Sequence, residues 1–228
     1  MYLLRLKPRW MSRALHSDYN LPLYLLTRLS FKAVRGSFLF SFIIIFVLIP
    51  ILNYGNYKLL GLTPELQITV VHTARRLMPI ACVFPAVMLF RLFMQTDSKE
   101  LLRITMCTRR LWVAFLACAL CIGLGGAVFV TYSRLFDGMF AEFCKIVAVC
   151  IMLFGIVSFL MSFSASTAIT LLLLTVYEAF LIVSTEPSFA NFVLYYNTKA
   201  DNAFSWLYIT ALGIFAMLAG EAVWRIRH

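Results

Sequence analysis

Six apolar runs, each close to the length of a membrane-spanning helix, dominate this chain of 228 residues. A helix needs roughly 20 mostly apolar residues to cross a hydrocarbon core of about 30 Å. Lipid offers the backbone no hydrogen bonds, so such runs adopt helices, which satisfy their own peptide groups. We therefore predict an all-α polytopic membrane protein with six transmembrane helices. The predicted helices lie at residues 37–53, 70–94, 111–132, 143–163, 165–184 and 204–224.

The composition also indicates lipid surroundings rather than water. Hydrophobic residues make up 62% of the chain and charged residues 13%, with a mean hydropathy of +0.89, whereas a soluble domain carries about 25% charged residues. The formal net charge of +10 would suggest nucleic acid in a soluble protein. In a membrane protein, basic residues orient the helices and meet anionic headgroups. We therefore expect contact with membrane lipid and no binding of nucleic acid.

The distribution of Lys and Arg predicts the orientation of the chain. Six crossings place both termini on one side, and the segments on that side hold fourteen basic residues, against six on the other. The positive-inside rule then predicts an integral protein of the cell inner or plasma membrane with both termini in the cytoplasm. Trp112, Trp206 and Trp224 lie at ends of predicted helices, where an indole N–H can stay in the wet interface.

The chain reads as a single transmembrane domain over residues 1–228. Residues 1–36 form a cytoplasmic or interfacial N-terminal segment, which ends either in a basic interfacial helix over 21–36 or in an ordinary basic flank. The six-helix membrane domain follows at 37–224, with a short cytoplasmic tail at 225–228. Residues 162–166 are either a tight turn or part of a re-entrant element, and the aromatic, polar segment 185–203 is either a loop or re-entrant helices.

The segment DSKELLRITMCTRR, residues 97–110, separates the second and third predicted helices and has a helical pattern of its own. Asp97 can cap a helix, and Glu100, three residues on, can close a capping box. Leu101 and Ile104 fall on one face, while Lys99, Arg103 and Arg110 can point elsewhere. An amphipathic helix of this kind docks either on the bilayer surface or in a groove on a cytoplasmic partner.

The order of these elements resembles the permeases of type-2 ABC exporters, which have a basic interfacial helix, six crossings and an intracellular helix after the second crossing. Glu100-Leu101-Leu102 and Thr108-Arg109-Arg110 match the pattern of that intracellular helix, the coupling helix of the family. Met106 and Cys107 stand where the family often has Pro, and Arg91 stands where it often has Glu.

The resemblance implies a permease subunit that forms a path for an amphiphilic substrate, such as a peptide, a lipid or a drug. It implies two partners: a separate ABC ATPase subunit, which binds ATP and Mg, and a second permease, either another copy or a related chain. This chain has no GxxxxGK[ST] phosphate loop and is expected to bind no cofactor itself. The residues that the resemblance assigns to contact with the ATPase are Glu100, Leu101, Leu102, Arg103, Ile104, Arg109 and Arg110.

Three charged residues are candidates for the transport path or its gate. Glu178 lies inside the fifth predicted helix, where an ionised group needs a partner or water. It could line the path, pair with Arg75 or Arg76 from the second helix, or extend to the nearby interface. Arg75 and Arg76 could hold an anionic headgroup or substrate, or anchor the helix at the interface. In the third helix, Gly123-Leu-Gly-Gly126 permits close helix packing.

Catalytic and metal-binding patterns are missing from the sequence. The three His residues are scattered, and neither HExxH nor GxSxG occurs, so we assign no catalytic and no metal site. The six Cys residues, including the CxxC of Cys118 and Cys121, read as small buried hydrophobes. Two alternatives to the permease remain: a membrane scaffold or immunity protein outside the ABC class, and a small integral-membrane enzyme.

Overall fold

The computed structural model describes residues 28, 31–95, 110–164, 166–183 and 203–227. Within these ranges the chain is helical, with short turns and no strand. Five of the described helical segments are long and apolar enough to cross a membrane. The predicted fold class is confirmed at this level: an all-helical bundle with several candidate membrane spans.

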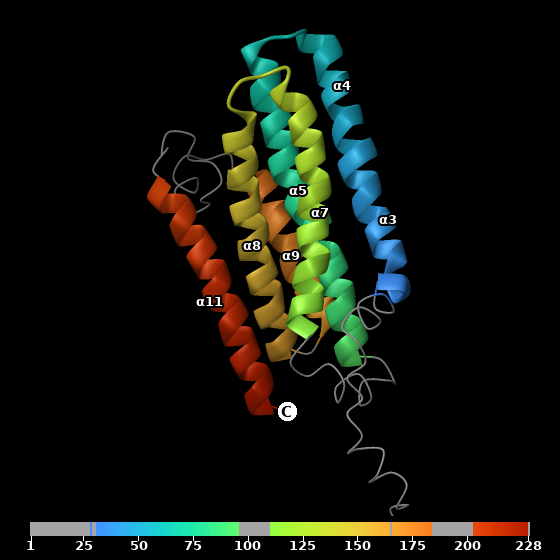
Figure 1. Ribbon diagram of the computed structural model, residues 1–228, viewed down its shortest axis with the longest axis vertical. Coiled ribbons are helices and arrows are strands. Elements are labelled where there is room, and N and C mark those ends of the chain that lie inside the picture. Colours follow the sequence, from blue (N-terminus) through green and yellow to red (C-terminus); the bar gives the residue numbers. More distant parts are fainter. Residues whose placement is uncertain (1–27, 29–30, 96–109, 165, 184–202, 228) are drawn as a thin grey trace, which may run out of the picture.

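The helices run up and down the long axis of the bundle (Figure 1). The elements are α3 (Arg35–Ile43), η1 (Ile44–Leu48), α4 (Ile49–Leu60), α5 (Pro64–Gln95), α7 (Arg110–Ser133), α8 (Met139–Ser164), α9 (Thr167–Val183) and α11 (Ala203–Arg227). We call the end where α3 begins and α11 ends the C-terminal end. The turns after α4 and α7 lie at the opposite end, the far end.

α9 corresponds to the fifth predicted helix and, with 17 residues, is shorter than the five candidate spans. Thr170 Oγ1 lies 3.2 Å from Met161 Sδ, nine residues back in the chain, so the chain reverses between α8 and α9. This contact fits a tight turn near residues 162–166. Because five segments meet the length of a span, the count of six crossings stays a prediction.

Two helices begin or end outside the predicted limits. The first span, predicted at 37–53, runs from Arg35 to Leu60. It continues through polar residues such as Asn53 and Asn56 and ends at Gly61, whose φ of 67° lies in the left-handed region that Gly tolerates. α5 begins at Pro64, where the missing N–H of proline costs nothing in the first turn.

A π-helical turn, η1, lies within the first span. Pro50 follows two residues later, and it has no N–H to donate to the carbonyl of Phe46. The wider π turn accommodates the proline ring in a helix that otherwise continues unbroken. Pro79 and Pro85 lie inside α5 without interrupting the helix.

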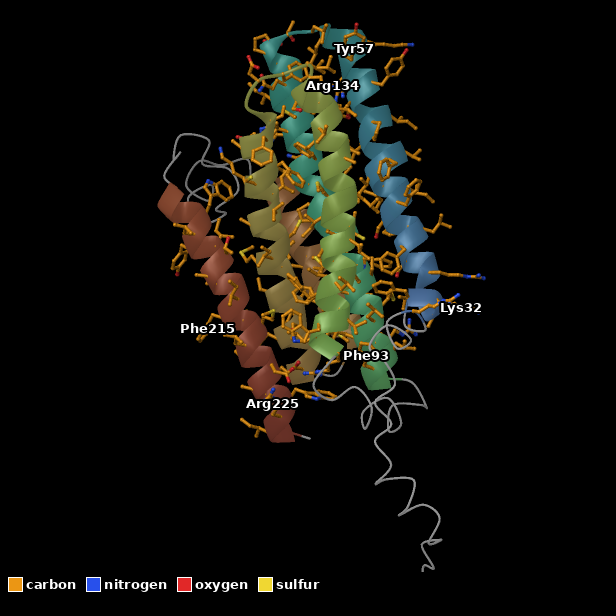
Figure 2. The ribbon with its side chains drawn as sticks, viewed as in Figure 1. Lys32, Tyr57, Phe93, Arg134, Phe215 and Arg225 are labelled. Carbon is orange, nitrogen blue, oxygen red and sulfur yellow. The ribbon has the colours of Figure 1, made fainter. Side chains whose placement is uncertain are left out.

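The core lies along α5 and α8, the two most buried of the candidate spans. Cys82, Cys118, Cys121 and Cys150 are buried as predicted. Cys144 is exposed, which corrects the expectation that all six cysteines are buried, because it lies on the outward face of α8. Cys107 is outside the described residues. The helices at the two edges, α3–α4 and α11, expose many large apolar side chains, as expected for surfaces in contact with lipid (Figure 2).

α8 and α11 pack backbone against backbone through glycine. A Cβ atom added at Gly213 would lie 2.6 Å from Met152 Cα, and one added at Gly220 would lie 2.9 Å from Phe159 Cα. Gly155 faces Gly213 from the other side. The seven-residue spacing of Gly213 and Gly220 places both on one face of α11. Small residues permit such contact in membranes, where dispersion replaces the hydrophobic effect as the packing force.

Gly213→Ala is therefore expected to separate α8 from α11 and to destabilise the protein by about 1–3 kcal/mol, since the new methyl meets backbone that cannot move aside. Gly123→Ala is the matched control, because nothing lies within 4 Å of a Cβ at that position. The control should be neutral, or stabilising by up to about 1 kcal/mol through helix propensity. Thermal unfolding in detergent measures both variants, and equal midpoints would contradict the close contact.

Candidate functional site

Most of the predicted ATPase-contacting residues fall outside the described part of the chain. Residues 96–109 contain Glu100, Leu101, Leu102, Arg103, Ile104 and Arg109. The flanking helices are described: α5 ends at Gln95 and α7 begins at Arg110, both at the C-terminal end of the bundle (Figure 1). The segment therefore joins α5 to α7 at the end where α11 also ends, and its assignment stays a prediction.

Arg110, the last residue of this segment and the first of α7, was expected to point away from the apolar face and to contact the ATPase, but its side chain lies inside the bundle. Its exposed fraction is 2%, and it is the largest of the fully buried side chains. One nitrogen, Nη2, lies 3.3 Å from Glu221 Oε2 and 3.4 Å from Ser162 Oγ, to which it donates. The guanidinium carbon lies 3.7 Å from the ring centroid of Trp224. A single side chain from α7 thus contacts both α8 and α11.

Arg suits this position better than Lys would. Its planar guanidinium can stack on an aromatic ring while its edge donates to a carboxylate, and it is more weakly hydrated than an ammonium. Glu221 is also contacted by Arg225, whose Nε lies 3.2 Å from Oε1. We call Arg110, Ser162, Glu221, Trp224 and Arg225 the Arg110 cluster. Trp224 was predicted to keep its indole at the wet interface, but it is buried beneath Arg110.

A second charged group lies nearer the far end of the bundle and joins α5 to α8. Arg75 of α5 donates to Glu142 of α8, and Lys145 Nζ donates to the other oxygen of Glu142 at 2.8 Å. Lys145 Nζ also lies 5.8 Å from the ring centroid of Trp206 in α11. We call Arg75, Glu142, Lys145 and Trp206 the Arg75 cluster. Arg75, Lys145 and Trp206, with Ile146 and Val149, line a shallow depression.

The three predicted pathway residues have different outcomes. Arg75 is buried and has Glu142 as its carboxylate partner. Arg76, the next residue of α5, is partly exposed. Glu178 belongs to α9, but its side chain lies outside the described part of the structure, so its role and its pairing stay predictions. The structure therefore supplies a partner for Arg75 that differs from the one considered from the sequence.

Glu142 and Glu221 are the functional candidates that the sequence reasoning missed. Glu221 lies inside the sixth predicted helix, so the argument that singled out Glu178, an ionisable group at membrane depth, applies equally to it. Glu142 immediately precedes the fourth predicted helix, where a charge looks ordinary. Only the packing of α5 against α8 shows that its carboxylate is held by two cations.

The geometry of the two clusters indicates contacts that hold helices together and not a reactive centre. In the described ranges, no three His, Cys, Asp or Glu side chains come together in a way that could hold a metal ion. Each cluster instead pairs one carboxylate with a cation from another helix and with a second cation from its own helix. Such partnered charges can stay buried, whereas a lone charge at these positions would be strongly destabilising.

Comparison with protein-family models, with curated proteins and with solved structures finds no match to this chain.

Removing the shared carboxylate should destabilise the far end. Glu142→Gln leaves Arg75 buried without its anion, and we expect a loss on the order of 1–3 kcal/mol, below the cost at a fully buried pair because Glu142 is partly exposed. Glu65→Gln is the control, since Glu65 is an exposed carboxylate on α5 at the same end of the bundle. Denaturant unfolding in detergent compares the two, and an equal effect would contradict the role given to Glu142.

Proposed function

We propose that this protein is the membrane-spanning permease subunit of an ATP-driven ABC exporter. The observation that carries the proposal is the position of the 97–110 segment. Its sequence matches the coupling pattern at Glu100-Leu101-Leu102 and Thr108-Arg109-Arg110, and its last residue is buried between three helices. A segment that docks on a partner and is anchored in the bundle is suited to carry force between the two.

The charges support placing this segment in the cytoplasm. Described basic residues near the C-terminal end are Arg28, Lys32, Arg35, Arg91, Arg110, Arg225 and Arg227, with Glu221 as the carboxylate among them. Those toward the far end are Lys58, Arg75, Arg76, Arg134 and Lys145, with Glu65, Asp137 and Glu142. Over the whole sequence, the segments on the side of the C-terminal end hold fourteen Lys and Arg residues against six on the other side, and the positive-inside rule assigns the side with more basic residues to the cytoplasm of a plasma or inner membrane.

The packing supports a path formed with a second permease. The core along α5 and α8 is filled by apolar side chains, and the depression at the Arg75 cluster is shallow. A transport path therefore fits better between two permease chains than inside one. Its walls would be mainly apolar, which suits an amphiphilic substrate such as a peptide, a lipid or a drug. The ATPase, with ATP and Mg, would be a separate chain that moves the 97–110 segment.

Apolar residues of the segment should hold the ATPase. Leu101→Asp and Leu102→Asp place a charge on the docking face and should weaken association by about 2 kcal/mol or more, roughly thirtyfold, while membrane insertion stays intact. Leu135→Asp is the matched control: Leu135 is an exposed leucine in the turn after α7, at the far end. The measurement is the ATPase retained by the tagged chain after gentle detergent extraction.

The same purification separates the alternatives. A correctly inserted Leu101→Asp/Leu102→Asp variant with unchanged association and unchanged stimulated ATP hydrolysis would overturn the coupling assignment. A wild-type chain that retains a partner other than an ATPase would favour a membrane scaffold or immunity protein. Turnover of a substrate by the isolated chain would favour a membrane enzyme.

A further inference from the structure

α8 and α11 form a closely packed pair, and of the two helices only α8 packs extensively on the rest of the bundle. Their backbones meet at Gly155, Gly213 and Gly220, and the main packing of α11 is on α8. The last of these contacts, Gly220 on Phe159, is close in both helices to Glu221 and Ser162. The Arg110 cluster therefore lies where the glycine contacts end, at the C-terminal end of the pair.

Arg110 reaches both members of this pair from α7. Its Nη2 lies near Ser162 Oγ of α8 and Glu221 Oε2 of α11, and its guanidinium stacks on Trp224 of α11. Arg225 contacts the same carboxylate, but it belongs to α11 itself and its side chain is 67% exposed. Of the two arginines on Glu221, Arg110 is thus the one that joins separate helices and is buried.

We propose that Arg110 is the positioning residue that clamps the start of α7 to the α8–α11 pair and so carries movement of the 97–110 segment to that pair. The clamp stands on the contacts alone, whereas the movement it carries rests on the proposed function. Because Arg110 is both the last residue of the segment and the first residue of α7, displacement of this end of the segment must either move the pair or break the contacts of Arg110.

A clamp of this kind depends on the geometry as well as on the charge. Lys in place of Arg110 would keep one positive charge but lose the planar guanidinium that stacks on Trp224 while one of its nitrogens contacts Glu221 and Ser162. Arg110→Lys should therefore loosen the clamp, with an effect between those of the wild type and of Arg110→Gln.

Distances between spin labels test the clamp in the isolated full chain in nanodiscs. Each spin label is attached to a keto amino acid that replaces an exposed residue. Labels at Trp112 of α7 and Ile226 of α11 report the distance at the C-terminal end, and labels at Val130 of α7 and Leu207 of α11 report the distance at the far end. Arg110→Gln should lengthen and broaden the 112–226 distance distribution and leave the 130–207 distribution unchanged. Arg225→Gln, which contacts the same carboxylate from an exposed position, should leave both unchanged.

A 112–226 distribution unaffected by Arg110→Gln would overturn the clamp. If Arg110→Gln fails to fold because it leaves Glu221 without its buried partner, the double variant Arg110→Gln/Glu221→Gln removes both charges and should give the same lengthening. An unchanged distribution in that folded double variant would overturn the clamp equally.

The transmitted movement has its own readout in the complex with the ATPase. Because the side chain of Arg110 is buried inside the bundle and not on the docking surface, Arg110→Gln should retain the ATPase but lose about tenfold or more of the stimulated ATP hydrolysis, whereas Leu101→Asp should lose the ATPase itself. Wild-type stimulation in an intact Arg110→Gln complex would overturn the transmission. A wild-type chain that recruits no ATPase would overturn the proposed function, while the label distances would still decide the clamp.

Discussion

A charged side chain inside an apolar bundle is stable only where the fold brings it an opposite charge and hydrogen-bond partners. Two arginines meet this requirement here, and α8 takes part in both cases. Glu142 near its start holds Arg75 of α5, and Ser162 near its end receives Arg110 of α7. Displacing α8 along its axis would disturb both groups, so these contacts fix its position and that of the helices around it.

The glycine contacts and the charged clusters have complementary effects. Between α8 and α11, glycine brings the backbones so close that dispersion acts over a long interface without any specific polar pair. Such an interface resists separation. The Arg110 cluster adds a directional contact at one end, and Lys145 lies near Trp206 of α11 toward the other. The peripheral helix α11 is thereby held in a defined position although most of its surface faces outward.

The helices themselves were predictable from the sequence, because long apolar runs have no other stable structure in lipid. Their packing was not. Lipid and protein core are both apolar, so a membrane helix is apolar all round, and its pattern does not say which side is buried. In the run singled out for close packing, Gly125 and Gly126 lie against the side chains of Met78 and Phe143 and Gly123 meets nothing, whereas Gly213 and Gly220 make the backbone contacts. The glycines alone gave no signal of this difference.

Some residues of the candidate site were likewise predictable from the sequence, whereas their partners were not. Glu178 was recognised because ionisable groups are rare at membrane depth, and Arg75 and Arg76 because they lie near one end of the second predicted helix. The partner of Arg75 depends on how α5 and α8 are rotated against each other. Arg110 was assigned to the amphipathic segment by its place in the motif, and its burial followed from the approach of α11, more than a hundred residues away. Such long-range pairs need the assembled bundle and cannot be read from local spacing.

Native mass spectrometry of the tagged wild-type chain, released gently from the membranes of its own host, tests the central claim most directly. The account predicts a complex that contains two permease chains and ATPase subunits with a phosphate loop, and that hydrolyses ATP. The chain alone, or with partners that include no ATPase, under conditions that preserve known ABC assemblies, would contradict it.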